Sequence, residues 1–231
     1  MELNRPQIDI GLFTNRIEEM KAFYGETLGL QFESELPVGG GFKQHRFVAN
    51  GSIIKLMESR DVLSLRHPGG YETLIIATNR VTDPAVLNDP DGNTIELVPP
   101  GRDDVKQIEV RLGVSDVDRF GAFYTKAADA VSIGDDRYRI GETIFATFRH
   151  PLAHTVKPAP LANLLAVVKT MAATGIRYVT LQVKNCDAAF KAMTEAGATV
   201  GSAPENFGTV ARAAFVRDPD GNFIELAQRP L

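Results

Sequence analysis

A nine-residue segment that occurs twice constrains the fold of this chain more than any other feature. Residues 89–97 read DPDGNTIEL and residues 218–226 read DPDGNFIEL, so eight of the nine positions are identical. In each copy the proline presets the first turn position, and the glycine supplies the positive φ angle that a bulged hairpin turn requires. The residues after the turn alternate as in a strand, with Ile and Leu on one face and Glu on the other. A repeat of this kind indicates a fold assembled from similar modules.

A second pair of similar segments supports this interpretation. Residues 8–24 and 108–124 align without a gap, with matches that include Ile8/Ile108, Leu12/Leu112, Phe23/Phe123 and Tyr24/Tyr124. The two kinds of segment alternate along the chain, which predicts two domains of two modules each. Because residues 99–101 read Pro-Pro-Gly, the expected boundary lies there. The first domain then spans residues 1–100 and the second spans residues 101–231.

The first and fourth modules follow the same plan. In the first, a strand around residues 8–12 precedes a helix that runs from Asn15 to Gly29, and three strand-like segments follow at 30–36, 43–50 and 52–58. In the fourth, the strand at 178–183 precedes a helix from Asn185 to about Ala196, and strands follow at 198–202, 209–216 and 223–228. The order of elements is βαβββ in both modules.

The second module is shorter than the others. Thr73 and Glu96 are 23 residues apart, whereas Tyr178 and Glu225, at matching places in the fourth module, are 47 residues apart. A helix and a strand are therefore missing, and we expect residues 58–70 or another subunit to cover what they leave exposed. A separate apolar helical pattern at residues 158–174 predicts a connecting helix that packs on the second domain.

Composition and charge exclude several classes of protein. The net charge is −4, and 29 acidic and 25 basic residues are mixed along the chain, which argues against nucleic acid and anionic membranes as partners. The segment MELNRPQIDIG lacks the apolar region of a signal peptide. The single cysteine, Cys186, excludes an internal disulfide and suits a reducing compartment. We therefore expect a cytoplasmic monomer or homodimer in which Cys186 is a packed, inert thiol rather than a nucleophile.

The repeated motifs resemble those of the vicinal oxygen chelate superfamily, which includes glyoxalases, bleomycin resistance proteins and extradiol dioxygenases. The resemblance rests on the pattern FY..LG (Phe23, Tyr24, Leu28 and Gly29) and on the closing DPDGN.IEL, and it covers most of the chain. It implies an α+β fold of tandem βαβββ modules, in which two modules curve around a bowl. In metal-dependent members, a divalent ion in the bowl takes ligands from the first and last strands of each module.

The resemblance also indicates which residues occupy those ligand positions. In the first domain they are Asp9, Lys55, Thr73 and Glu96, and in the second they are Glu109, Phe145, Tyr178 and Glu225. None is a histidine, and the four histidines fall elsewhere, at His45, His67, His150 and His154. A zinc or iron site of the His/Glu type is therefore not expected. If a divalent iron, manganese or zinc ion is bound, the remaining ligand pairs are Asp9 with Glu96, or Glu109 with Glu225.

Catalytic roles can be assigned to five of these residues as hypotheses. Strand alternation turns Glu96 and Glu225 toward the bowl as candidate bases. Lys55, meeting Asp9 and Glu96, would be a built-in cation in place of a metal, or else a solvated surface lysine. His45 would be an acid-base group in the same cavity or a structural residue of its strand.

Tyr178 would pair with Glu225, either for acid-base chemistry or as a hydrogen bond that satisfies the core. Phe145 would form an apolar wall beside that pair. The expected substrate contacts are Asp9, Thr73, Glu109 and Phe145.

Three functions are compatible with this pattern. The first is a glyoxalase-like lyase or isomerase that uses carboxylate acid-base chemistry on a small molecule without the usual metal. The alternative is a metal-free protein that binds and sequesters a ligand, as bleomycin resistance proteins do. A ring-cleaving dioxygenase ranks last because it requires a metal site that the second domain does not offer.

Overall fold

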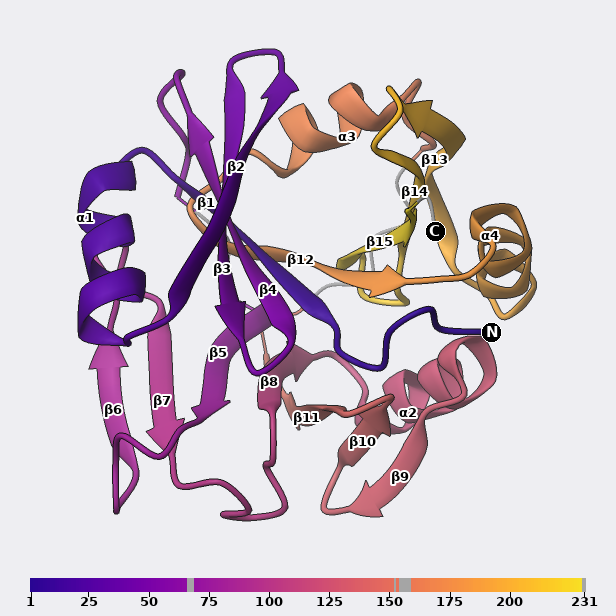
Figure 1. The fold of residues 1–231 in the computed structure, drawn as a ribbon. Helices are drawn as coiled ribbons and strands as arrows, with labels where there is room; N and C mark the ends of the chain where they lie inside the picture. The colour runs from indigo at the N-terminus through magenta and orange to yellow at the C-terminus, as the bar shows by residue number, and fades with distance from the viewer. Residues whose placement is uncertain (66–68, 152, 154–158, 230–231) are drawn as a thin grey trace.

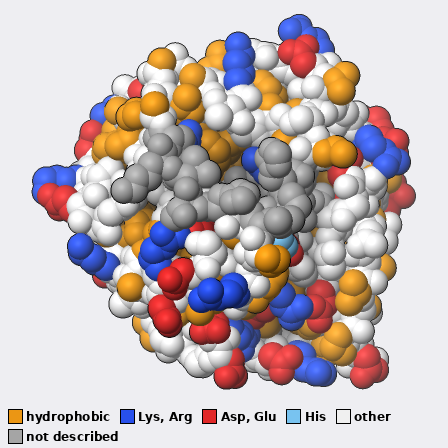
Figure 2. Space-filling view, turned by 180° about the vertical axis from the view of Figure 1, so that it is seen from behind, with side chains coloured by type: hydrophobic (Ala, Val, Ile, Leu, Met, Phe, Trp, Pro, Cys, Tyr) orange, Lys and Arg blue, Asp and Glu red, His pale blue; other side chains and the backbone are white. Residues whose placement is uncertain are grey.

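The computed structural model describes residues 1–65, 69–151, 153 and 159–229. These residues form two curved sheets, with helices lying beside and between them (Figure 1). None of the described helices combines the length and the hydrophobicity that a membrane-spanning segment needs. On the face seen in Figure 2, Lys and Arg side chains are interspersed with Asp and Glu.

Elements of the four modules follow the expected order. The first module contains β1 (Asp9–Thr14), α1 (Ile17–Ala22), the π-helical turn η1 (Phe23–Thr27), β2 (Gln31–Gly39), β3 (Phe42–Ala49) and β4 (Ser52–Ser59). The second contains β5 (Gly70–Ala77), β6 (Ala85–Asn88) and β7 (Thr94–Val98). The third contains β8 (Ile108–Val114), α2 (Val117–Ala128), β9 (Val131–Gly134), β10 (Arg137–Ile140) and β11 (Thr143–Arg149). After α3 (Leu164–Met171), the fourth contains β12 (Gly175–Gln182), α4 (Cys186–Glu195), β13 (Thr199–Phe207), β14 (Ala211–Arg217) and β15 (Phe223–Gln228). The α+β class and the truncation of the second module are confirmed.

One sheet joins the first and last modules of the sequence, and the other joins the second and third modules. One sheet has the order β13-β14-β15-β12-β1-β4-β3-β2, so it combines the first and fourth modules, and the other has the order β6-β7-β5-β8-β11-β10-β9. Their central contacts are antiparallel pairs of first strands, β1 with β12 and β5 with β8. The expectation that modules 1 and 2 share a bowl, and modules 3 and 4 another, is therefore wrong at the level of the sheets. The first strand of every module has similar backbone hydrogen-bonding groups along its edge. The sequence repeat therefore does not determine which two first strands pair with each other. The domain boundary near residue 100 stays a prediction.

The two repeated motifs contact each other in space. The hydroxyl of Tyr24, in the first module, donates to the Asp89 carboxylate at 3.1 Å, and Tyr124 donates to Asp218 at 3.3 Å. Both aspartates are buried and also accept hydrogen bonds from the backbone of their own turns. Each FY segment is thus fastened to the DPDGN turn of the following module, which explains why the two motifs occur together.

The exposed face of the short second module is covered by the first module. Buried side chains of α1 and η1, including Met20 and Tyr24, belong to the same core as Leu74 and Ile95 of the second sheet. The segment from residue 58 was expected to give this cover. Its described part runs elsewhere, because Ser64 pairs with Ala173 in an isolated bridge beside the end of α3. The expectation for residues 58–70 is therefore wrong where they are described.

Helix α3 lies inside the predicted range 158–174 and bridges the open side of the first sheet (Figure 1). Its buried residues Val167, Val168 and Met171 belong to a core with Phe13 of the first module and Phe215 of the fourth. The helix was expected to pack on the second domain, and it does contact the fourth module. It contacts both modules because the first and fourth modules share one sheet.

Candidate functional site

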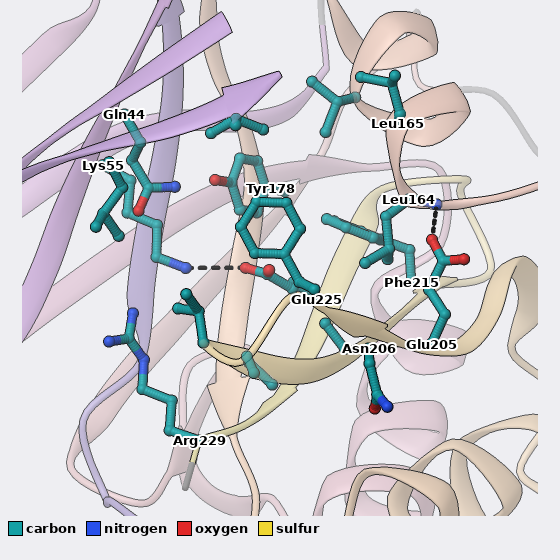
Figure 3. Close-up of a pocket in the computed structure, with 18 of the residues that line it drawn as sticks. Gln44, Lys55, Leu164, Leu165, Tyr178, Glu205, Asn206, Phe215, Glu225 and Arg229 are labelled. Atoms are coloured by element: carbon teal, nitrogen blue, oxygen red, sulfur yellow. Dashed lines mark hydrogen bonds and ion pairs between the residues drawn. The ribbon is translucent and has the colours of Figure 1, made fainter. Parts of the chain in front are cut away.

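A cavity of about 340 Å³ lies in the bowl of the eight-stranded sheet (Figure 3). Much of its wall is apolar, with side chains from β4, α3 and β14 that include Met57, Leu164, Val168, Ala213 and Phe215. Its size is that of a pocket for a small organic molecule. The strands of the first and fourth modules supply its floor, because their alternation turns every second side chain toward the concave face.

Two polar side chains that line this floor, Lys55 and Glu225, form a closed set of hydrogen bonds with the fully buried Thr180. The Lys55 ammonium donates to Glu225 Oε2 at 2.8 Å and to Thr180 Oγ1 at 2.6 Å. Thr180 in turn donates to the same Glu225 oxygen at 2.6 Å. Lys55 is only 3% exposed. The Lys55–Glu225 pair is therefore a buried ion pair with good geometry, and the alternative of a solvated surface lysine is wrong.

Electrostatics on the floor favour the charged form of Glu225. Burial by itself raises the pKa of Glu225, but the charge and hydrogen bond of Lys55, together with Thr180, outweigh it and hold the pKa below its usual range. Burial raises the pKa of Tyr178 well above its usual value, and the charges of Glu225 and Asp9 raise it further. The Lys55 Nζ atom lies 5.5 Å from the centroid of the Tyr178 ring. At neutral pH the cavity thus contains a carboxylate and a protonated phenol.

Asp9 is a buried carboxylate next to the Lys55–Glu225 pair. Its carboxylate is fully buried and accepts hydrogen bonds from Gln182 at 3.0 Å and from the Ile53 amide at 2.9 Å. It also forms an ion pair with Arg5, while Lys55 is 3.8 Å away. Because these partners already bind both carboxylate oxygens, Asp9 fixes the positions of neighbouring strands. Direct contact with a substrate stays a prediction.

The structure places Glu96, Glu109 and Thr73 on the other sheet. Arg111 forms ion pairs with Glu96 at 3.1 Å and with Glu109 at 3.3 Å, and Arg137 forms a second pair with Glu109 at 2.6 Å. Thr73 lies opposite Arg111 in the strand register. Lys55 therefore meets Asp9 and Glu225 rather than Asp9 and Glu96, as a result of the sheet pairing.

Two further candidates also lie outside the cavity. His45 is on β3 with its ring between Glu58, at 2.9 Å, and Glu35, at 3.3 Å, and it does not line the pocket. Phe145 is fully buried and stacks on Tyr124, with ring centroids 5.8 Å apart, in the core beside α2. The structure thus brings together Lys55, Tyr178, Glu225 and the supporting Asp9, but neither His45 nor Phe145.

Sequence reasoning missed Thr180, Gln182 and Arg229. Thr180 and Gln182 follow Tyr178 at alternate positions of β12. Because side chains alternate along a strand, the sequence could have placed Thr180 and Gln182 on the same face as Tyr178. Arg229 lies just after β15 and outside both repeated motifs, which is why no pattern pointed to it. It lines the cavity at the end where Lys55 lies (Figure 3).

The side chains on the floor do not fit a divalent metal ion. An ammonium group stands among the carboxylates, and the described residues contain no cluster of three or more His, Cys, Asp or Glu side chains that could hold a metal. The two ligand pairs considered from the sequence, Asp9 with Glu96 and Glu109 with Glu225, each divide between the two sheets. His150 lies 3.6 Å from Glu72, and His67 and His154 lie outside the described residues.

Cys186 lies in the core at the start of α4. Burial, and then the nearby Asp187 charge, raise the pKa of its thiol to about 12. Its Sγ is 3.6 Å from the Leu226 carbonyl oxygen, to which it donates. A thiol with these properties is protonated at neutral pH and is a poor nucleophile.

Comparisons with known proteins agree with this fold. The profile of the Glyoxalase/Bleomycin resistance protein/Dioxygenase superfamily matches residues 106–226. No curated protein matches the chain in sequence.

Several solved structures share the architecture at low identity. Glyoxalase I from Zea mays has a TM-score of 0.69 at 14% identity, over 96% of this chain and 92% of that one. A protein from Bacillus subtilis, provisionally named a dioxygenase, has a TM-score of 0.68 at 14% identity, over 100% of this chain and 86% of that one. The CppA protein from Streptococcus pneumoniae has a TM-score of 0.57 at 12% identity, over 99% of this chain and 100% of that one. At these identities the likeness concerns the fold alone.

Proposed function

We propose that this chain, which belongs to the Glyoxalase/Bleomycin resistance protein/Dioxygenase superfamily, binds a small, largely apolar organic molecule above the Lys55–Glu225 pair, without a divalent metal ion. The observation that carries this proposal is a largely apolar cavity of about 340 Å³. The Lys55 and Glu225 side chains on its floor already form an ion pair with each other. A ligand that enters the cavity need not displace a bound cation. The gain in free energy comes from the burial of apolar surface.

Lys55 supports the metal-free part of this proposal. A carboxylate facing an enclosed apolar space requires a compensating cation or hydrogen-bond donors. Lys55 and Thr180 supply both to Glu225 within 2.8 Å. The ammonium group thus neutralises the carboxylate locally, which is one of the effects that a metal ion would have.

Ligand binding and metal content test this proposal together. The expected result is saturable binding of small aromatic probes, measured by calorimetry and thermal shift, with affinities that do not change after dialysis against a chelator. Phe215→Asp, which places a charge in the apolar wall, should abolish binding, whereas Val131→Asp on the exposed surface should not. Stoichiometric iron, manganese or zinc in the dialysed protein would contradict the metal-free assignment.

A specific observation favours a second candidate, a lyase or isomerase that removes a proton next to a carbonyl group. Glu225 accepts the hydrogen bonds from Lys55 and Thr180 through its Oε2 atom. Its Oε1 atom would then accept the proton from the substrate. Tyr178, whose raised pKa keeps it protonated, would donate a hydrogen bond to the developing oxyanion. The lowered pKa of Glu225 weakens it as a base, and this is why binding ranks first.

Turnover distinguishes the two candidates. For an enzyme, Glu225→Gln should lower turnover of a carbonyl substrate by about 10²–10⁴-fold, the usual contribution of a general base. For a binding protein, bound ligand should be recovered unchanged after prolonged incubation. Proton exchange of a bound ketone with deuterated water, followed by NMR, would detect even partial chemistry.

A further inference from the structure

A second and smaller cavity adjoins the polar end of the main one. Its volume is about 190 Å³, and it shares Gln182 and Arg229 with the main cavity. Arg5, Arg46 and Glu33 also line it. Three guanidinium groups therefore surround a small space beside a largely apolar pocket.

The charges around this space do not balance. Each nearby carboxylate already has its own cation, since Asp9 pairs with Arg5, Glu33 with Arg46 and Glu225 with Lys55. Arg229 remains, and it forms no ion pair or hydrogen bond with any other residue in the described ranges. Among the residues that the structure describes, one positive charge is thus left over where the two cavities meet.

Arg229 is also held in an unfavourable position for a cation. Burial, and then the charge of Arg46, lower the pKa of Arg229, although Asp9, Glu225 and Glu33 act in the opposite direction. A partly buried guanidinium without an anion of its own loses hydration and gains no hydrogen bond in return. An anionic group placed beside it would supply both charge and acceptors.

We infer that Arg229, with Arg46 beside it, binds the carboxylate of an amphipathic organic acid whose apolar part fills the main cavity. A guanidinium presents two parallel N–H donors that match the two oxygens of a carboxylate. One unmatched positive charge corresponds to one negative charge on the ligand. This inference rests on the proposed function, because it assumes that the main cavity takes an apolar molecule, and it adds the chemical class of that molecule.

The experiment compares acids with their neutral amides. Cinnamate and naphthylacetate would be titrated against the full chain by calorimetry, alongside cinnamamide and naphthylacetamide. We expect each acid to bind about 10–100-fold more tightly than its amide, the range for hydrogen bonds to charged groups. Arg229→Gln should remove this preference while the amides bind as before, and added salt should weaken the acids only.

Arg212→Gln is the matched control, because Arg212 forms its ion pair with Asp187 away from both cavities. This variant should keep the full preference for acids. Since Arg229 forms no ion pair with any other described residue, Arg229→Gln should unfold at nearly the same denaturant concentration as the unmodified chain. A large loss of stability would instead assign Arg229 a structural role and overturn the inference.

The possible failures can be told apart. If acids and amides bind equally, the carboxylate assignment is wrong and the apolar cavity remains a ligand site. If inorganic phosphate competes with the acids and binds more tightly than they do, the subsite is one for a more highly charged anion and the inference is wrong. If neither acids nor amides bind, the proposed function fails and the inference fails with it.

Discussion

Replacing Lys55 with methionine tests the central feature of the site. Lys55 and Glu225 form a buried pair at 2.8 Å, and their side chains are 4% and 19% exposed. Methionine retains much of the length and apolar contact of lysine but removes the charge, so that Glu225 faces the cavity without its cation. Breaking a buried pair in this way costs about 3–5 kcal/mol of unfolding free energy.

Two comparisons isolate the charge effect. The double variant Lys55→Met/Glu225→Leu removes both charges and should recover most of the lost stability, because uncharged replacements of a buried pair are often neutral or stabilising. Lys191→Met breaks the exposed pair with Glu195, whose side chains are 73% and 62% exposed, and should change stability by less than about 0.5 kcal/mol.

The dependence on pH has a defined sign. In the unmodified chain the pKa of Glu225 is lowered on folding, so its stabilising contribution is present above its usual pKa and is lost as the pH falls through the folded value. Without Lys55, burial dominates and raises the folded pKa of Glu225, so acidification should then stabilise Lys55→Met relative to the unmodified chain.

Urea denaturation at several pH values measures both effects. A loss of less than about 1 kcal/mol in Lys55→Met, together with no difference in pH dependence, would refute the buried ion pair as the basis of the site.

Three further predictions concern other parts of the chain. Burial raises the pKa of Asp218 to about 6 from 3.8, so its contribution to stability is present below pH 3.8 and is lost as the pH rises through 6, a change of about 3 kcal/mol. The difference in unfolding free energy between Asp218→Asn and the unmodified chain should vary over this range, and a constant difference would contradict the assignment. Tyr124→Phe should cost about 1 kcal/mol in urea denaturation, since it removes the 3.3 Å hydrogen bond to Asp218, whereas Tyr138→Phe, as a control on a partly exposed ring, should cost less. The Cys186 thiol, with a pKa of about 12, should react with a maleimide at neutral pH only after denaturation, and rapid labelling of the folded chain would show that it is not buried.

Local patterns in the sequence were sufficient for the elements and their order. The repeated turns, the strand alternation and the helical stripe at residues 158–174 each reflect interactions within a short stretch of chain, and the structure contains the corresponding hairpins, strands and α3. The same local rule turned Lys55 and Glu225 toward the concave face of a sheet. The missing helix of the second module also followed directly from the spacing between Thr73 and Glu96.

Only the tertiary structure decided which modules share a sheet. A first strand of this kind presents similar hydrogen-bonding edges in every module, so the sequence determines the face on which a side chain lies but not the strand that comes to lie beside it. By pairing β1 with β12, the fold brings Glu225, rather than Glu96, to Lys55 across 170 residues of sequence. It also places Phe145 and His45 away from the cavity and leaves Arg229 beside it. The twin DPDGNxIEL segments therefore identified the repeated modules, while the pairing of the strands between modules determined which of their two glutamates belongs to the candidate site.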